Sequence, residues 1–301
     1  MGSHFKLIAA IAAFISLTTG IHAAEYDLFA RTNLVAWCIV PFDAKKRGPE
    51  ERSQMLEDLG IRRLAYDYRS EHIPTFDAEI AALKKHNIEL TAWWFPGILN
   101  GEARTIINTI KRNKVQTQLW VTGSGETVTT PRDNTARVEQ EVLRLGPIAD
   151  AAQKIGCKVA LYNHGGWFGE PTNQLAIIQR LRMPNVGIVY NLHHGHDQMD
   201  RFKNLLALMK PHLFAINLNG MVEGGDKSDK KILPLGQGTR ELELLKTIKE
   251  SGWHGPIGIL NHTDADAELR LRDNLEGLDW LVAQLNGRDA GPKPTPRSWK
   301  P

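Results

Sequence analysis

The sequence predicts one fold class, a single (β/α)8 barrel, and three observations support it. Short apolar, β-branched runs alternate eight times with longer amphipathic runs. Most of the short runs are apolar on both faces, as parallel strands covered by helices must be. The repeat fills about 260 residues, which is the usual size of such a barrel. A doubly wound open sheet is the alternative, but residues 41–43 (PFD) provide no glycine-rich phosphate loop after the first run.

The expected elements follow one another in regular order. The strands are residues 34–40, 61–67, 88–95, 117–122, 158–163, 187–192, 213–218 and 257–261. The helices are residues 49–59, 76–86, 103–113, 135–155, 171–181, 198–209, 239–251 and 265–285. Pro49 and Pro171 stand at first turns, and Asp264 is a possible N-cap of the last helix. Three glycines stand where helix C-caps are expected: Gly60, Gly156 and Gly252.

The two ends of the chain differ from the repeat. Residues 7–17 (LIAAIAAFISL) are apolar and precede the small residues Ala23 and Ala24, which is the layout of a secretory signal peptide over residues 1–24. The apolar run is too short for the roughly 20 residues of a membrane span. We therefore expect a periplasmic or secreted protein without stable membrane association, with its barrel over residues 25–286. Residues 287–301 are polar and proline-rich, and they predict an irregular tail.

The composition excludes several classes of protein. With 42% hydrophobic and 24% charged residues, the chain is not disordered, a coiled coil or collagen-like. The 37 Lys and Arg against 34 Asp and Glu leave a net charge of +3, which is too small to indicate a nucleic-acid or anionic-membrane partner. The two cysteines, Cys38 and Cys157, adjoin apolar runs, so we expect buried thiols rather than a disulfide.

Polar and aromatic residues gather where the predicted strands end. A barrel brings the carboxyl ends of all its strands to one mouth, so these residues are expected to converge there. Tryptophan rings can cover the apolar face of a sugar, although they also cap barrel cores. Side-chain amides are neutral groups that suit a hydroxyl-rich ligand, although a single Asn is also common in turns. The expected residues for binding a small carbohydrate are Trp37, Arg69, Trp94, Trp120, Asn163, Trp167, Asn191, His196, Asn217, Asn219, Asn261 and His262.

Histidines supply the candidate proton-transfer groups, because imidazole exchanges protons near neutral pH and also binds first-row metals. His164 and His194 are the expected acid–base pair. Together with His262 they could hold Zn²⁺ or a similar ion, and a metal-free site is equally compatible. If the strand pleat continued through NLHHGH, His194 and His196 would share one face and His193 would point away.

Asp67 and Arg69 end the second predicted strand. They form either a buried ion pair or a functional pair, in which Asp67 orients a histidine or acts as a base and Arg69 holds a substrate oxygen. Residues 220–235 form a long glycine-rich and charged loop, which is either a lid over the mouth or a plain insertion.

Five segments resemble a known superfamily: LYNHGGW, GIVYNLHHGH, AINLNG, PLGQG and HGPIGILNH. In this order they resemble the last four strands of the sugar isomerase/epimerase-like superfamily, the xylose isomerase-like barrel shared with endonuclease IV-type proteins. The resemblance covers residues 30–285. It implies a divalent metal held by Glu, Asp, His and Glu on the last four strands, which polarises a sugar carbonyl. The matching positions are Tyr162 or Asn163, Asn191, Asn217 or Asn219, and Asn261.

All three anionic ligands of that metal are therefore absent, although the spacing from Asn191 to His194 is kept. A divalent metal remains possible, but the family's two-carboxylate mechanism does not transfer. We expect an exported enzyme of isomerase, epimerase or lyase type, in which His164, His194 and Asp67 move protons beside the carbonyl of a neutral sugar, keto-sugar or glycoside derivative. The alternatives are a sugar-binding barrel that has lost its metal and a His-cluster metallohydrolase. A DNA-repair role is not expected, because the three-metal ligand set is incomplete.

Overall fold

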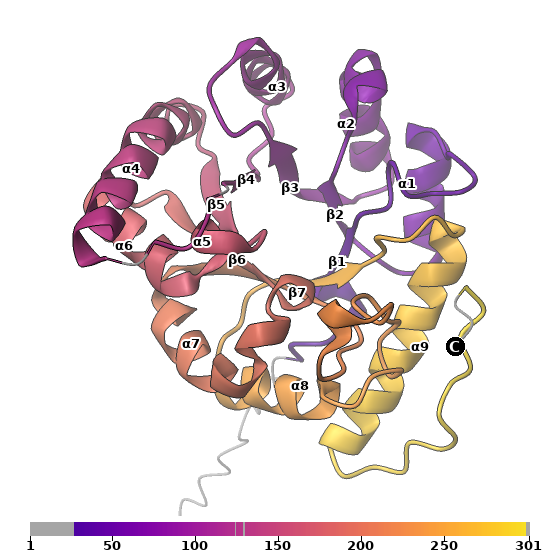
Figure 1. Ribbon diagram of the computed structural model, residues 1–301. Coiled ribbons are helices and arrows are strands. Elements are labelled where there is room, and N and C mark those ends of the chain that lie inside the picture. Colours follow the sequence, from indigo (N-terminus) through magenta and orange to yellow (C-terminus); the bar gives the residue numbers. More distant parts are fainter. Residues whose placement is uncertain (1–26, 124, 129, 299–301) are drawn as a thin grey trace, which may run out of the picture.

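The computed structural model describes residues 27–123, 125–128 and 130–298, and these form a closed barrel of eight parallel strands (Figure 1). Neighbouring strands in the chain are neighbours in the barrel, and the last strand pairs with the first. The predicted fold class is confirmed, whereas the predicted signal peptide lies outside the described residues. The strands are β1 (Leu34–Trp37), β2 (Arg63–Tyr66), β3 (Glu89–Phe95), β4 (Gln118–Thr122), β5 (Lys158–Tyr162), β6 (Val186–Asn191), β7 (Leu213–Leu218) and β8 (Ile257–Leu260).

Helices surround the barrel, as Figure 1 shows. They are α1 (Pro49–Asp58), α2 (Phe76–Lys85), α3 (Gly101–Arg112), α4 (Pro131–Gln153), α5 (Gly166–Gly169), α6 (Pro171–Leu181), α7 (Phe202–Met209), α8 (Glu241–Glu250) and α9 (Ala267–Leu285). Short 3-10 helices are η1 (Arg31–Asn33), η2 (Ser70–Thr75), η3 (Leu192–His194), η4 (His196–Arg201), η5 (Lys210–His212) and η6 (Gly225–Lys227). The short helix α5 was not expected from the sequence.

Several of the predicted helix starts need correction. Helix α4 begins at Pro131 and not at residue 135. Helix α7 begins at Phe202 and not at residue 198, because the tighter turn η4 occupies the preceding residues. Helix α9 is capped by Asp266, whose carboxylate accepts a hydrogen bond from the Glu268 amide at 3.0 Å, so the predicted N-cap Asp264 is wrong. The three C-cap glycines are confirmed as left-handed residues, with φ of +72°, +72° and +68° at Gly60, Gly156 and Gly252.

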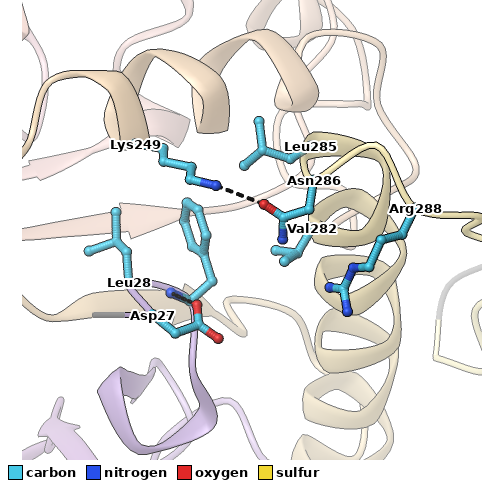
Figure 2. A pocket seen from close by; sticks show the side chains of 8 residues that line it. Asp27, Leu28, Lys249, Val282, Leu285, Asn286 and Arg288 are labelled. Atoms are coloured by element: carbon cyan, nitrogen blue, oxygen red, sulfur yellow. Dashed lines mark hydrogen bonds between the residues drawn. The ribbon is translucent and has the colours of Figure 1, made fainter. Parts of the chain in front are cut away.

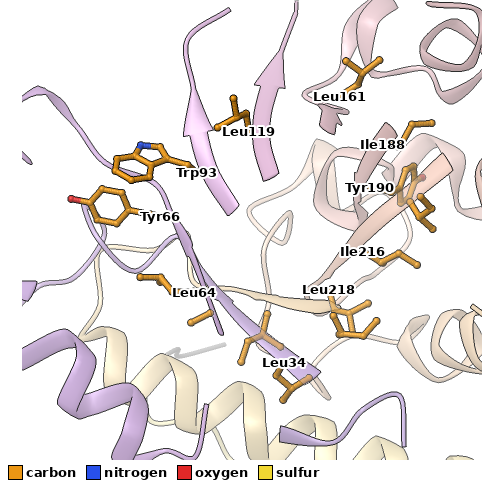
Figure 3. Packing of buried hydrophobic residues seen from close by; sticks show 14 of the residues in the cluster. Leu34, Leu64, Tyr66, Trp93, Leu119, Leu161, Ile188, Tyr190, Ile216 and Leu218 are labelled. Atoms are coloured by element: carbon orange, nitrogen blue, oxygen red, sulfur yellow. The ribbon is translucent and has the colours of Figure 1, made fainter. Parts of the chain in front are cut away.

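Two apolar layers hold the barrel together. The outer layer lies between strands and helices and holds large side chains, several of which are labelled in Figure 3: Leu34, Leu64, Tyr66, Trp93, Leu119, Leu161, Ile188, Tyr190, Ile216 and Leu218. The inner layer is a separate cluster in which small side chains leave room for three rings: Ala65, Ala92, Ala160 and Ala215 pack with Trp37, Trp120 and Tyr162. Rings from β1, β4 and β5 therefore fill the inside of the barrel toward its mouth.

The opposite end of the barrel carries a surface groove of about 440 Å³. Asp27 and Leu28, which lie close before β1, line it together with Lys249 of α8 and residues at the end of α9 (Figure 2). Barrel enzymes build their sites at the carboxyl ends of the strands, so this groove is not the candidate site. Described residues 287–298 form an irregular tail, which Asp273 of α9 fixes by accepting the amides of Arg297 and Ser298 at 2.9 and 2.8 Å.

Both cysteines are buried and free, as predicted. Within the part of the chain that the structure describes, no helix is both long and apolar enough to cross a bilayer.

Candidate active site

A cavity of about 120 Å³ opens at the carboxyl ends of the strands. Residues that follow or end β1, β2, β3, β5, β6 and β8 line it, so the structure brings together side chains from three quarters of the barrel. The lining residues are Trp37, Cys38, Phe42, Asp67, Arg69, Trp94, Tyr162, His164, His193, His194 and His262.

Aromatic rings form one wall of the cavity. The Trp37 ring centroid lies 6.0 Å from Trp94, and Trp94 meets Tyr162 edge-on at 5.0 Å. The Trp37 indole donates a hydrogen bond to the Tyr162 hydroxyl at 3.3 Å, which fixes both rings. Trp94 is partly exposed, so it offers a ring face to a bound molecule.

Two of the predicted sugar-binding tryptophans lie elsewhere. Trp120 is fully buried beneath the cavity and meets Trp37 edge-on with a centroid separation of 4.7 Å. Trp167, on α5, is also buried, and its indole donates to the Asn134 side chain at 2.6 Å. Both rings support the barrel core and neither lines the cavity.

Asp67 is the one buried carboxylate among the lining residues, and its two oxygens differ. Oδ1 accepts the Val40 amide at 3.3 Å, while the buried Oδ2 has no hydrogen-bond partner. Burial raises the pKa of Asp67 to about 7, against the lowering effect of the nearby Arg69 charge. Arg69 does not pair with this carboxylate, because its Nη1 donates to the backbone carbonyls of Asp67 and Tyr68 at 2.9 and 2.8 Å. The buried ion pair is therefore not what the described residues form.

Three histidines from two strand ends meet beside the aromatic wall. The His164 and His194 ring centroids are 4.5 Å apart, and those of His193 and His194 are 3.7 Å apart. The strand pleat does not continue, because the chain turns into η3 at Leu192. The condition for His193 to point away is therefore not met, and His193 lines the cavity. His196 faces the 220–235 loop instead, with Nε2 3.0 Å from the Lys231 carbonyl.

The imidazoles of His164, His194 and His262 are neutral at physiological pH. Burial and then the neighbouring His164 lower the pKa of His194 to about 3. Burial likewise lowers the pKa of His164 and, together with the charge of Arg69, that of His262. A neutral imidazole both donates and accepts a hydrogen bond, so these rings can bind an oxygen without adding charge.

The predicted amide ring lies behind the cavity wall. Asn163 Oδ1 accepts from the Asn191 backbone amide at 2.7 Å and from Asn191 Nδ2 at 2.8 Å, and Asn191 Oδ1 in turn accepts from Asn217. Asn261 Oδ1 accepts from Asn274 at 3.0 Å. Asn219 donates to the Lys231 carbonyl at 3.2 Å and so helps to fasten the 220–235 loop. None of the amides at these strand ends lines the cavity.

These contacts test whether the metal implied by the resemblance fits. The amide oxygens of Asn163, Asn191 and Asn261 already accept hydrogen bonds, whereas the buried Oδ1 atoms of Asn217 and Asn219 have no partner. All of these side chains are neutral. Amide oxygens are weak cation ligands compared with the carboxylates they replace. Among the described residues, no group of three or more His, Cys, Asp or Glu side chains is arranged to hold a metal ion. The four positions therefore do not fit the divalent metal.

The 220–235 loop lies against this rim. Gly220 pairs with Leu233 across its base, and the buried Arg270 of α9 donates to the Ile232 carbonyl at 3.5 Å. Ile232 packs on the inner cluster of rings that includes Trp37. The loop thus covers part of the mouth, and its opening as a lid stays a prediction.

Four lining residues are not among the expected catalytic and sugar-binding residues: Cys38, Phe42, Tyr162 and His193. Tyr162 is expected only as a position that matches a metal ligand in the resemblance. Cys38 directly follows Trp37 at a strand end, so the rule that selected the other residues could have found it. Phe42 lies two residues beyond the predicted strand and gave no such signal. Its ring lies 4.0 Å from His262 and 5.3 Å from the Arg69 guanidinium carbon.

Comparison with known proteins agrees with this architecture. A family model described as a xylose isomerase-like TIM barrel matches residues 41–283. No curated protein sequence matches the chain significantly. A solved 3-keto-D-glucoside 4-epimerase from E. coli is 14% identical, with a TM-score of 0.63 over 84% of this chain and 99% of that one. A D-psicose 3-epimerase is 12% identical, with a TM-score of 0.58 over 86% and 99%. A probable 3-DHS dehydratase from Bacillus anthracis is 13% identical, with a TM-score of 0.63 over 81% and 98%.

Proposed function

Because this chain belongs to the xylose isomerase-like TIM barrel family, we propose that it is a carbohydrate-active enzyme of isomerase, epimerase or lyase type. Its substrate is a neutral sugar, keto-sugar or glycoside derivative. The observation that carries the proposal is the buried carboxylate of Asp67, which lines the cavity with one oxygen unpartnered and a pKa of about 7. Leaving a buried carboxylate oxygen without a partner costs free energy, so a bound group is expected to complete it.

The reaction begins with removal of a proton from the carbon beside the substrate carbonyl. Asp67 is the proton acceptor, because a pKa near 7 leaves it half ionised at neutral pH and matches the working range of a general base. The neutral rings of His164 and His194 hydrogen-bond the carbonyl oxygen as negative charge develops there. The low pKa of His194 favours this role over that of a proton acceptor.

The enediolate formed in this step has three outcomes. Return of the proton to the neighbouring carbon isomerises the sugar, return to the opposite face of the same carbon epimerises it, and loss of a β-substituent is a lyase reaction. No step passes through a metal, because the Asn163, Asn191 and Asn261 oxygens are committed to hydrogen bonds. Relatives of the same fold include epimerases of a 3-keto-glucoside and of D-psicose, which supports a keto-sugar as the substrate class.

The aromatic wall supports a neutral sugar. Trp37 and the partly exposed Trp94 present ring faces that suit the C–H face of a pyranose. Two of the five N–H donors of Arg69, both on Nη1, bind backbone carbonyls, and the other three can reach a substrate oxygen.

The proposed enzyme is exported to the periplasm or secreted. The apolar residues 7–17 and the small residues that follow support this location. Cell fractionation of the full chain and of a chain lacking residues 2–24 tests it, and recovery of both forms in the cytoplasm would contradict export.

The second candidate is a sugar-binding barrel without turnover. The neutral amides at the family's metal positions favour it, because such substitutions are what loss of the metal would leave. A binder, however, gains nothing from a buried carboxylate that must be partly neutralised.

One experiment separates the two candidates. The chain is incubated in D₂O with D-fructose, D-psicose and methyl 3-keto-D-glucoside, and carbon-bound hydrogen exchange is followed by NMR. We expect exchange beside the carbonyl, reduced by at least about 100-fold in His164→Ala/His194→Ala and unchanged in His212→Ala, which lies at the opposite end of the barrel. Sugars that raise the melting temperature but never exchange would establish a binder, and turnover that survives the double variant would reject these histidine roles.

Metal content is measured on the same protein. Elemental analysis and a thermal-shift panel of divalent cations are expected to give the same result for the native chain and for His194→Ala. A cation that stabilises only the native chain would instead favour the metallohydrolase.

A further inference from the structure

Cys38 is a wall residue of the cavity to which the proposed reaction assigns no role. It directly follows β1, lines the cavity and is only 6% exposed. Its φ of +59° lies in the left-handed region, which is uncommon for any residue other than glycine, asparagine or aspartate. The backbone thus holds a thiol at the mouth in a strained conformation.

The same turn of chain faces Asp67 with two groups. The Val40 amide donates to Asp67 Oδ1 at 3.3 Å, and the Cys38 thiol lies beside the carboxyl. Burial first, and then the charge of Asp67, raise the pKa of the Cys38 thiol, while Arg69 opposes this. The thiol therefore stays protonated at neutral pH and is a proton donor, not a nucleophile.

The unpartnered oxygen of Asp67 indicates a function for this thiol. Asp67 Oδ2 is buried, has no hydrogen-bond partner and belongs to the same cavity wall as Cys38. A substrate carbon that approaches Oδ2 closely enough to lose its proton thus also approaches the thiol. Proton donor and proton acceptor stand side by side at the reacting carbons.

We propose that Cys38 is a catalytic residue of the proposed reaction, the acid that returns a proton to the enediolate after Asp67 has removed one. The C–H bond of the substrate breaks and an O–H bond forms on Asp67, leaving the electron pair in the enediolate. The S–H bond of Cys38 then breaks as a new C–H bond forms, leaving a thiolate. Transfer of the Asp67 proton to this thiolate restores both groups, so the cycle needs no other reactant.

The order of proton affinities supports the last step. A thiol whose pKa is raised above 9 holds its proton more tightly than a carboxyl with a pKa of about 7, so the proton moves from Asp67 to the thiolate without an uphill step. Among the described residues, the Arg69 guanidinium and the Tyr162 hydroxyl also interact with Cys38. Burial raises the pKa of the Tyr162 hydroxyl well above its usual value, so this group keeps its own proton at neutral pH.

The first test separates proton removal from product formation. It rests on the proposed function and compares the native chain, Cys38→Ser and Cys157→Ser in D₂O with the same three sugars. Cys157 is the other buried thiol of the chain and lies beside the start of β5, far from the mouth. In Cys38→Ser, Asp67 still exchanges the substrate hydrogen, while product formation falls by about 100-fold or more. In Cys157→Ser, both rates stay at the native values.

Two results of this test overturn the assignment. Native product formation in Cys38→Ser removes the thiol from the reaction. An equal fall of exchange and product formation makes Cys38 a positioning residue that acts through Asp67. Absence of both exchange and turnover in the native chain would instead contradict the proposed function, on which the Cys38 assignment rests.

A second measurement needs no substrate. It tests whether Cys38 and Asp67 interact even if the native chain shows no turnover. In Cys157→Ser labelled with ¹³Cβ-cysteine, the single signal of Cys38 is followed between pH 5 and 9. We expect it to shift with a midpoint near pH 7 as Asp67 ionises, and to stay flat in Cys157→Ser/Asp67→Asn. A flat signal in both proteins shows that the two groups do not exchange protons or charge and overturns the proposal.

Discussion

The two sides of the barrel mouth differ in their ionisable groups and in how far their buried polar atoms are hydrogen-bonded. Beside β1 and β2, the buried Asp67 and Cys38 face a cavity, and one carboxylate oxygen lacks any partner. Beside β5 to β8, the amides of Asn163, Asn191 and Asn217 hydrogen-bond one another and are 1% exposed or less. One side is ionisable and incomplete, whereas the other is neutral and mostly satisfied.

From this difference we infer which side of the mouth carries proton transfer. A hydrogen-bonded buried amide stabilises the protein and has no proton to give at neutral pH. A buried carboxyl with an unpaired oxygen lowers the free energy of unfolding, and such groups are often found at functional sites. The amides at the metal positions of the resemblance hydrogen-bond mainly within the protein, and we infer that proton transfer lies across the barrel, at β1 and β2.

The largest expected effect tests the reactive side. Asp67→Asn removes the proposed proton acceptor while keeping its size, so kcat/KM for hydrogen exchange is expected to fall by roughly 10²–10⁴-fold. The rate of hydrogen exchange followed by NMR gives this value, and circular dichroism checks that the variant is folded. Asp264→Asn, which alters an exposed carboxylate near the mouth, serves as the matched control. Asp67→Asn with native activity would contradict the comparison.

The next effect tests the satisfied side. Asn191→Asp buries a carboxylate where Asn191 Nδ2 now donates to Asn163, so two acceptors face each other. The free energy of unfolding at pH 8 is expected to fall by about 1–3 kcal/mol, as for a lost buried donor, or by more if the charge stays. Urea denaturation measures it. The exposed Asn108→Asp on α3 should change stability little, and equal stability of both variants would show that the amide chain is not structural.

The pH dependence of stability comes third. Because the pKa of Asp67 is raised from 3.8 to about 7, the native state holds this proton more tightly than the unfolded state. Its stabilising contribution is complete below pH 4 and is lost as the pH rises to about 7. The unfolding free energy of the native chain relative to Asp67→Asn should therefore fall by about 1.4 kcal/mol per pH unit in this window. Parallel denaturation profiles would refute the raised pKa.

The smallest effect concerns the wall that joins the two sides. Trp94→Ala removes a ring face but no acid–base group, so KM should rise about tenfold or less while kcat changes little. The buried Trp120→Phe keeps the core filled and serves as the control, with KM unchanged. A fall in kcat alone for Trp94→Ala would show that the ring positions the reacting atoms.

Local patterns in the chain predicted the barrel well. Apolar runs with flanking glycines locate all eight strands to within a few residues, because strand and helix periods depend on neighbouring residues. The strand-end rule also selected Asp67, Arg69, His164 and His194, which the cavity brings together. It could not distinguish these from Asn163 or Asn191, since residues at neighbouring strand ends look alike in sequence whether they face the cavity or one another.

The sequence by itself thus determined the barrel, the end of the barrel that carries the site and the loss of the family's anionic ligands. Only the tertiary structure decided which strand-end residues line the cavity. Whether Asp67 Oδ2 is unpartnered, whether His193 lines the cavity and whether Asn191 is satisfied depend on contacts between residues tens of positions apart. Burial and pairing set the pKa of each group, and both are properties of the packed barrel and not of the local chain.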